Sequence, residues 1–188
     1  MTAREYEALP EDISRTIEIV DGYVVLCEAP SPAHQKASRR LATLIEEHAR
    51  VAMKRGHGPL AVDNSVDVRL RDVPLSNLRS DVVLYRCPDR DRGERLRAGH
   101  VLLVAEVVSP GSETRDSTGK PGVYAKAGIP NYWIVRLDDT GVSIIERYRL
   151  DHASRLYKHV GTFMKDEGGK PEVSNPISLT IDWQDLEF

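Results

Sequence analysis

The stretch VLLVAEVVSP at residues 101–110 carries the clearest signal of a central strand in the sequence. Its first five residues are apolar without a break, which is typical of a central strand that is covered on both faces of a sheet. Glu106 interrupts the apolar run, and an ionised carboxylate in a buried strand is costly unless it is paired or binds a cation. The stretch therefore predicts a central strand over 100–109 that carries a buried carboxylate in need of an explanation.

Strand and helix patterns alternate on both sides of this stretch. Residues 16–26 place two β-rich runs around an Asp-Gly pair, which is a strong hairpin signal. A long helix is expected over 32–54, because apolar residues recur at helical spacing after a Ser-Pro start and the pattern stops at Gly56. Further strands are expected at 60–70, 80–85, 131–137, 142–150 and 156–160, with a charged loop at 86–97 and a short helix at 121–127.

This order of elements predicts an α/β fold, on the border of α+β, with one mixed β-sheet flanked by helices and an N-terminal β-hairpin. The chain has 188 residues, of which 40% are hydrophobic, so it can bury a core without disulfides or a structural metal. No linker long enough to separate two domains is visible. We therefore expect a single domain over 1–188, with a core at about 16–150 and a β-rich extension at 151–188.

The amino-acid composition argues against several classes of protein. Cys27 and Cys87 are too few for a disulfide framework and lack the paired spacing of a zinc site, which indicates a reduced, intracellular protein. No stretch approaches the ~18 uninterrupted apolar residues of a membrane span, and the polar start lacks a signal-peptide core, so a cytoplasmic location is expected. The net charge of -3 argues against a protein coated in positive charge for nonspecific polyanion binding.

Asp81 and Glu106 are the first candidate functional pair, since each lies on a predicted strand. If the two strands are neighbours, the carboxylates converge at one sheet edge and can hold Mg²⁺ or Mn²⁺ through oxygen ligands. Such an ion lowers the pKa of bound water and stabilises charge that develops on a phosphodiester. The alternative is structural: Asp81 caps the start of a strand and Glu106 pairs with an arginine.

Asp116, Lys120 and Tyr124 follow at intervals of four and would share one face of an unbroken helix. A lysine beside a metal-bound phosphate would stabilise the transition state by its charge and could orient the attacking water. The alternative is an ordinary surface ion pair, which is common and weak. Pro121 disfavours the helical conformation at Lys120, so the helix is expected to begin at Pro121. Lys120 then reaches the site from a loop, or the site is partly degraded.

Five motifs occur in order between about residues 18 and 150. They are Glu18-Ile19-Val20-Asp21-Gly22, Ser31-Pro32-x-His34, Ser80-Asp81-Val82-Val83, Glu106-Val107-Val108-Ser109-Pro110, and the block from Asp116 through Lys120 and Tyr124 to Val135. This set resembles the Uma-two family of restriction-endonuclease-like proteins, which is placed in the PD-(D/E)XK nuclease superfamily. The resemblance implies a restriction-endonuclease-like core and Mg²⁺- or Mn²⁺-dependent cleavage of DNA.

The resemblance also implies roles for individual residues. Asp81 and Glu106 match the metal ligands, and Lys120 is similar to the catalytic lysine that this family places on the following helix. The superfamily pattern has that lysine two residues after the second acid, where this chain has Val108. Glu18 and His34 match recurring family positions, which implies that they complete the candidate catalytic set at the outer part of the site. The possible border of the site is formed by Ser109, Asp116 and Tyr124.

Four aromatic or imidazole side chains belong either to the site or to the core. His34 would suit a metal ligand or a general base, because a neutral imidazole can take a proton from water near pH 7. A histidine in a first helical turn is otherwise a solvated or capping side chain. His48 is expected to be a packed histidine, and Tyr124 and Trp133 are expected to be core aromatics, although Tyr124 could also border the site.

Basic residues concentrate in two segments. The stretch 36–55 carries six basic against two acidic side chains, and 86–97 carries five arginines against three acids. Either surface could follow the phosphates of DNA, or both are simply solvated or salt-bridged.

Two functions remain open: a metal-dependent endonuclease acting on DNA, and a degraded nuclease-fold protein that serves as a binding or assembly module. A homodimer is expected by analogy with superfamily nucleases that cut both strands.

Overall fold

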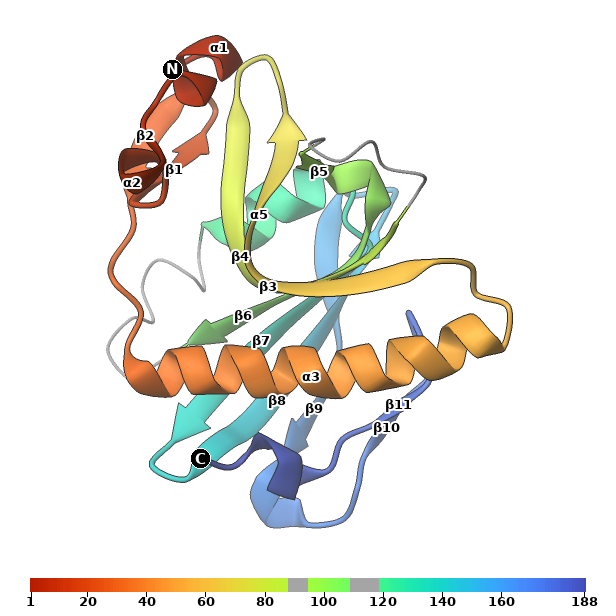
Figure 1. The fold of residues 1–188 in the computed structure, drawn as a ribbon. Coiled ribbons are helices and arrows are strands. Elements are labelled where there is room, and N and C mark those ends of the chain that lie inside the picture. The colour runs from red at the N-terminus through yellow and green to blue at the C-terminus, as the bar shows by residue number, and fades with distance from the viewer. Residues whose placement is uncertain (88–94, 109–118) are drawn as a thin grey trace.

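The computed structural model describes residues 1–87, 95–108 and 119–188. Within this part of the chain, nine strands form one mixed sheet whose main path runs β2-β1-β4-β6-β7-β8-β9, while β3 pairs with β4 and β5 pairs with β3 (Figure 1). The strands of this sheet are β1 (Ile17–Val20), β2 (Tyr23–Leu26), β3 (Leu60–Arg71), β4 (Ser76–Arg86), β5 (Leu96–Arg97), β6 (Val101–Val108), β7 (Asn131–Asp138), β8 (Gly141–Asp151) and β9 (Leu156–Met164). The α-helices are α1 (Ala3–Glu7), α2 (Glu11–Ser14), α3 (Pro32–Lys54) and α5 (Lys120–Lys126).

The apolar stretch forms β6 in the interior of the sheet, antiparallel to β4 and parallel to β7. Ala105 and Val107 pack in the core cluster that contains the apolar face of α3. Val104 and Val108 pack on the opposite face, in a cluster that contains Tyr124 of α5. Successive strand residues point to opposite faces, so a strand buried on both sides has to be apolar throughout. The expected mixed sheet with a doubly covered central strand is confirmed.

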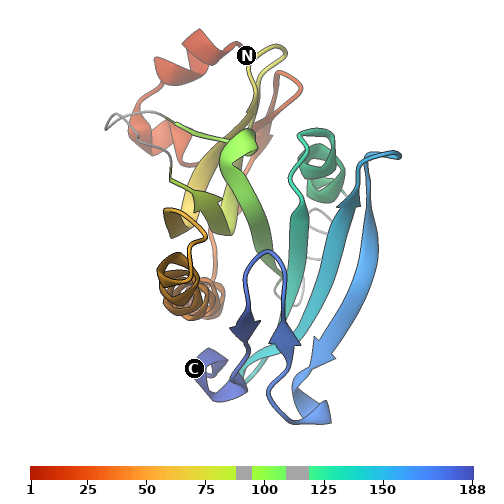
Figure 2. The ribbon, with the colours of Figure 1, turned by 90° about the vertical axis from the view of Figure 1, so that its right-hand side faces the viewer.

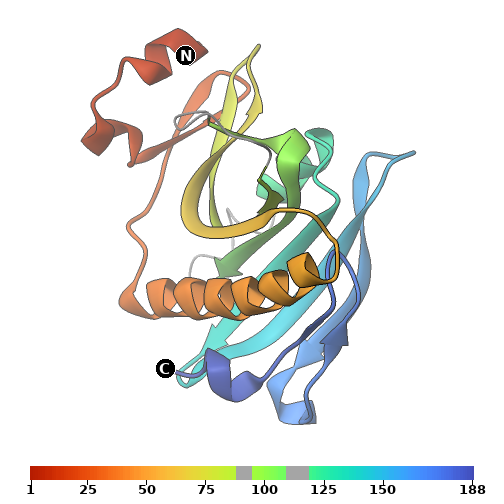
Figure 3. The ribbon, with the colours of Figure 1, turned by 45° about the vertical axis from the view of Figure 1, so that its right-hand side comes forward.

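Helix α3 has the bounds that the sequence predicts and lies across one face of the sheet (Figure 3). The Ser31 hydroxyl accepts a hydrogen bond from the His34 N–H at 3.2 Å, which caps the first turn, and Pro32 occupies that turn without losing a helical hydrogen bond. Gly56 follows the helix with φ +94°, a conformation that favours glycine.

The predicted N-terminal hairpin is also confirmed, since β1 pairs with β2 in antiparallel register. Asp21 and Gly22 connect the strands with φ values of +51° and +86°. Positive φ at both central positions is the mark of a type I′ turn, whose twist matches that of the flanking strands.

Several boundaries differ from the sequence prediction. β4 begins at Ser76 rather than at residue 80, because buried polar residues hide the strand pattern: Ser76 bonds the Asp21 N–H and Asn77 donates to Tyr6 Oη. Helices α1 and α2 were not expected; the buried Tyr6 ring holds α1 against the hairpin. The segment predicted as a charged loop contains β5, and β9 continues to Met164.

The C-terminal residues cover the same face of the sheet as α3. They form a two-stranded sheet of β10 (Glu172–Val173) and β11 (Leu179–Thr180), followed by the 3₁₀ helix η3 (Trp183–Leu186). Figure 2, which looks along α3, shows η3 below this helix. Leu179 and Trp183 belong to the α3 core cluster, so the β-rich extension is part of that core. No helix in the described ranges has the length and apolar character needed to cross a membrane.

Candidate active site

The candidate site lies where two paired strands separate. The β4–β6 ladder ends at the pair Val82–Ala105. On the N-terminal side of Val82, β4 lies beside β1 instead, where Asn77 pairs with Ile19. Asp81 precedes Val82 on β4 and Glu106 follows Ala105 on β6, so both acids lie just beyond the last pair of the ladder. The expectation that the two acidic strands are neighbours is therefore confirmed, and antiparallel register brings both carboxylates to the same fork.

Asp81 is held by a backbone amide and an imidazole. Its Oδ2 atom accepts the Val107 N–H at 2.8 Å and lies 3.0 Å from His34 Nε2. His34 stands in the first turn of α3, which the Ser31 cap fixes. The side chains of Asp81 and His34 are only 17% and 15% exposed, so the pair is partly shielded from water yet reachable from outside.

Glu106 is the most deeply buried acid of the group. Its Oε1 atom accepts a 2.7 Å hydrogen bond from the Tyr124 hydroxyl, and its Oε2 atom lies 3.2 Å from Lys120 Nζ. Burial raises the pKa of Glu106 well above its usual range, and the charges of Asp81 and Glu18 act in the same direction, against the lowering effect of Lys120. The partner of Glu106 is thus a lysine, not the arginine of the structural alternative.

Lys120 is the first residue of α5, one position earlier than predicted, and Pro121 lies in the first turn, where its missing N–H costs no hydrogen bond. Lys120 Nζ lies 3.1 Å from Glu18 Oε1 as well as 3.2 Å from Glu106 Oε2. Glu18 in turn accepts the backbone N–H of Arg79 at 2.9 Å. The lysine therefore bridges two acids. It reaches them from the first position of α5 and not from the loop that the sequence predicts for an intact site.

Tyr124 combines the two interpretations that the sequence leaves open. It is fully buried in the core, and its hydroxyl contacts both Glu106 and Ser80 Oγ, the latter at 3.0 Å. Burial and the charge of Glu106 raise the pKa of Tyr124 well above its usual range, so the hydroxyl keeps its proton and acts as a donor. Trp133 is a core aromatic, as predicted.

Some site residues were missed and others lie outside the described residues. Sequence reasoning gave no role to Ser80 or to the amides of Arg79 and Val107, although a buried serine beside Asp81 is a usable signal. Ser109 and Asp116, both expected at the border of the site, fall outside the residues that the structure describes.

The donor set suits a hard divalent cation. Carboxylate oxygens are the ligands that Mg²⁺ prefers, and Mg²⁺ is commonly held by one or two carboxylates together with water and substrate oxygens. Glu106 is buried near the negative charges of Asp81 and Glu18, and Lys120 is the cation that pairs with it. A further positive charge would offset the repulsion that remains among the three carboxylates. Within the described ranges, no group of three or more His, Cys, Asp or Glu side chains forms a ready ligand cluster. By the chemistry of their donors, Asp81 and Glu106 fit an ion held by two carboxylates.

The chain is similar to two known proteins. A protein of Synechocystis sp. named "Uncharacterized protein slr1290" is 30% identical over 125 residues, which is 66% of this chain and 62% of that protein. The chain thus matches less than two thirds of the length of this curated relative. The crystal structure of "a putative nuclease belonging to DUF820" from Anabaena variabilis shares the fold, with a TM-score of 0.67 and 16% identity over 96% of this chain and 94% of that one.

The family model Uma2, described as "Putative restriction endonuclease", matches residues 3–184. This range contains the strand fork at Val82 and Ala105 and both elements that bring Glu18 and Lys120 to it. The resemblance inferred from the five sequence motifs is confirmed: the chain belongs to the Uma2 family of restriction-endonuclease-like proteins.

Proposed function

We propose that this protein is a Mg²⁺- or Mn²⁺-dependent endonuclease that hydrolyses phosphodiester bonds in DNA. The observation that carries the proposal is the meeting of Asp81, Glu106 and Lys120 at the end of the β4–β6 ladder. Membership of a restriction-endonuclease-like family supports the same class of reaction.

Asp81 and Glu106 are the residues that would hold the ion. When bound, a divalent cation supplies a water of lowered pKa and neutralises charge on the phosphate. The protein's part is to present the two carboxylates in a fixed arrangement. The Val107 amide and His34 hold Asp81, while Tyr124 holds Glu106.

Lys120 and His34 add charge and proton transfer. Lys120 keeps its ammonium group at the fork through Glu18 as well as Glu106, so it can stay there while Glu106 takes another partner. In that position it can donate to a phosphate oxygen as negative charge develops. His34 places a partly exposed imidazole beside Asp81, which is the kind of group that acts as a general base toward water.

Helix α3 carries exposed basic side chains. Lys36 and Arg39 are exposed within two turns of His34. Their positive charges give DNA phosphates partners on the helix that also carries His34. A homodimer would supply the two sites needed to cut both strands, and light scattering tests it: a mass near twice 21.0 kDa supports it and a mass near 21.0 kDa contradicts it.

The test is cleavage of single- and double-stranded DNA with Mg²⁺ or Mn²⁺ by the wild type, Asp81→Asn and Glu106→Gln. Both variants should lose nearly all activity, because each removes one negatively charged ligand. Glu167→Gln, an exposed change in the 3₁₀ helix after β9, should cleave like the wild type. Equal cleavage by the wild type, Asp81→Asn and Glu106→Gln would refute the proposal.

The second candidate function is a catalytically degraded nuclease fold that acts as a binding or assembly module. Val108 at the usual lysine position and the ion pairs that Glu106 and Glu18 already form with Lys120 favour it. Calorimetric titration with Mn²⁺ separates the two candidates. Saturable binding that disappears in Glu106→Gln supports the nuclease, and the absence of binding supports the degraded form.

A further inference from the structure

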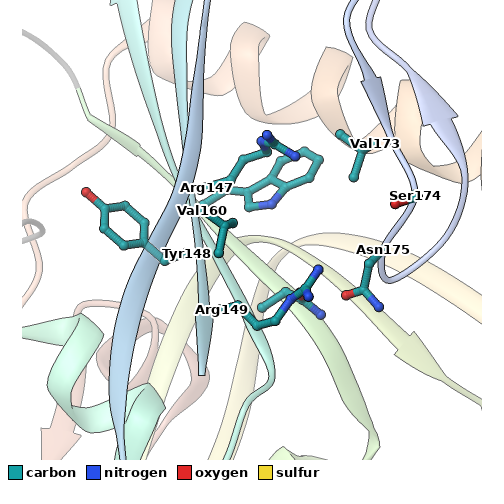
Figure 4. Close-up of a pocket in the computed structure, with 9 residues that line it drawn as sticks. Arg147, Tyr148, Arg149, Val160, Val173, Ser174 and Asn175 are labelled. Carbon is teal, nitrogen blue, oxygen red and sulfur yellow. The ribbon is translucent and has the colours of Figure 1, made fainter. Parts of the chain in front are cut away.

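Two arginines of β8 reach into one small cavity on the face of the sheet opposite Glu106. Trp133 pairs with Ala105 on one side and Arg147 on the other, so these three residues share the α3 face, while the adjacent Glu106 points the other way. Figure 4 shows Arg147 and Arg149 projecting toward the β10–β11 segment, and Tyr148 projecting away from it. The cavity has a volume of about 30 Å³ and opens to solvent, and its lining includes Asn131, Trp133, Arg147, Arg149, Ser174 and Asn175.

The backbone of β9 makes room for Arg147. The β8–β9 register shifts between Arg147, which pairs with Gly161, and Tyr148, which pairs with His159, so Val160 is the extra residue of a bulge. A Cβ atom at Gly161 would lie 2.6 Å from Arg147 Nη2. The guanidinium thus occupies space that only glycine leaves open, and it stacks 4.0 Å from the centre of the Phe163 ring.

The two arginines have no counter-charge in the described part of the chain. No acidic side chain there forms an ion pair with Arg147 or Arg149, and Arg147 Nε is buried without a hydrogen-bond partner. Burial lowers the pKa of Arg147, and the like charge of Arg149 lowers it further. An anion from solution would stabilise these two guanidinium groups, because it would offset their repulsion and offer an acceptor to the buried donor.

We propose that Arg147 and Arg149 form a binding site for one phosphate group, separate from the carboxylate fork. Guanidinium groups bind phosphate oxygens through paired N–H donors, and the side chains of Ser174 and Asn175 add neutral donors at the rim. Because the cavity opens to solvent, a phosphate group can meet the two guanidinium groups at its mouth, either as inorganic phosphate or as the phosphate of a mononucleotide whose remaining part stays outside. The site does not rest on the proposed nuclease activity.

Calorimetry of the full chain tests the site with two probes, inorganic phosphate and a deoxynucleoside 5′-monophosphate, in buffer that contains EDTA and no other oxyanion. We expect saturable binding of one phosphate per chain. Arg149→Met should weaken it at least about tenfold, because a charge-assisted partner is lost. Arg50→Met, which removes an exposed arginine of α3, is the control for net charge and should bind like the wild type.

Gly161→Ala is the second variant, and it leaves the net charge unchanged. Its Cβ should displace the Arg147 guanidinium and weaken phosphate binding, with circular dichroism to verify the fold. Binding of inorganic phosphate as tight as that of the nucleotide identifies free phosphate as the ligand, and tighter nucleotide binding identifies a nucleotide. The proposal is overturned if neither probe binds, or if folded Arg149→Met binds as tightly as the wild type.

Discussion

Tyr124 donates a 2.7 Å hydrogen bond to Glu106 from within the core, where neither side chain is more than 1% exposed. The buried carboxylate therefore has a neutral donor at Oε1, the Tyr124 hydroxyl, which also contacts Ser80. The positive charge of Lys120 lies at its other oxygen, Oε2. The acid is held between an apolar cluster on one side and the open strand fork on the other. This arrangement leads to tests that separate the hydrogen bond from the ion pair.

Tyr124→Phe should lower the free energy of unfolding by about 1–3 kcal/mol, because Glu106 loses a donor while the ring stays in place. Cleavage of DNA should fall as well, since the carboxylate is no longer oriented. Urea denaturation and a cleavage assay measure the two effects. Tyr157→Phe is the control: it removes a hydroxyl that donates to Ile129 O in the same aromatic cluster, and should leave activity unchanged. Unaltered stability of Tyr124→Phe would contradict the role given to this hydrogen bond.

Lys120→Met should destabilise the fold by about 3–5 kcal/mol in EDTA, because it leaves the buried acids Glu18 and Glu106 without their cation. Mg²⁺ should restore part of this loss if the carboxylates bind it, and thermal unfolding with and without Mg²⁺ measures the difference. Lys126→Met removes an exposed lysine from the last turn of the same helix, and should change stability by less than about 0.5 kcal/mol. Equal stability of the two variants would show that the ion pairs contribute little.

Cys27 should react slowly with iodoacetamide at neutral pH. Burial raises the pKa of its thiol to about 11, and the nearby charge of Glu18 acts in the same direction. A raised thiol pKa means that the reactive thiolate is scarce at low pH, so the rate should rise roughly tenfold per pH unit between pH 7 and 10. Mass spectrometry of the Cys27 peptide follows the reaction. The urea-unfolded chain is the control and should level off near the ordinary thiol pKa of about 8.5; the same profile in the folded protein would refute the prediction.

His48→Leu should loosen the C-terminal segment. His48 Nδ1 lies 2.9 Å from Leu44 O, and its Nε2 accepts the backbone N–H of Thr180 at 3.1 Å, so the ring is a packed histidine, as predicted. Loss of this acceptor leaves a strand amide unpaired and should cost about 1–3 kcal/mol. Limited proteolysis should then cut within 165–188 sooner than in the wild type. His57→Leu changes an exposed histidine and should have no such effect.

The sequence predicts the elements whose cause is local. The unbroken apolar run predicts β6, the Asp-Gly pair predicts the hairpin, and helical spacing predicts α3 with its bounds. The start of β4 could not be predicted in this way, because Ser76 and Asn77 are buried through partners that come from the distant residues Asp21 and Tyr6.

For the candidate site, too, the sequence predicts the features with a local cause and not those that depend on the folded chain. The cost of burying a carboxylate draws attention to Glu106 from the sequence alone. Its contacts with Tyr124 and Lys120 follow from helical spacing once α5 lies over β6. The strand fork itself depends on β4 leaving β6 for β1, and Ser80 acquires its contact with Tyr124 only in the folded chain.

The amides that hold Asp81 and Glu18 belong to Val107 and Arg79, and every amino acid except proline carries such an N–H group. Substitutions at these two positions therefore leave both donors in place, provided that the new side chain fits. The two backbone contacts are thus insensitive to most mutations, unlike the side-chain contacts that His34, Tyr124 and Lys120 make with the acids. Residues 79 and 107 can therefore change during evolution while both hydrogen bonds to the acids remain. Proline is the replacement that would remove the donor outright.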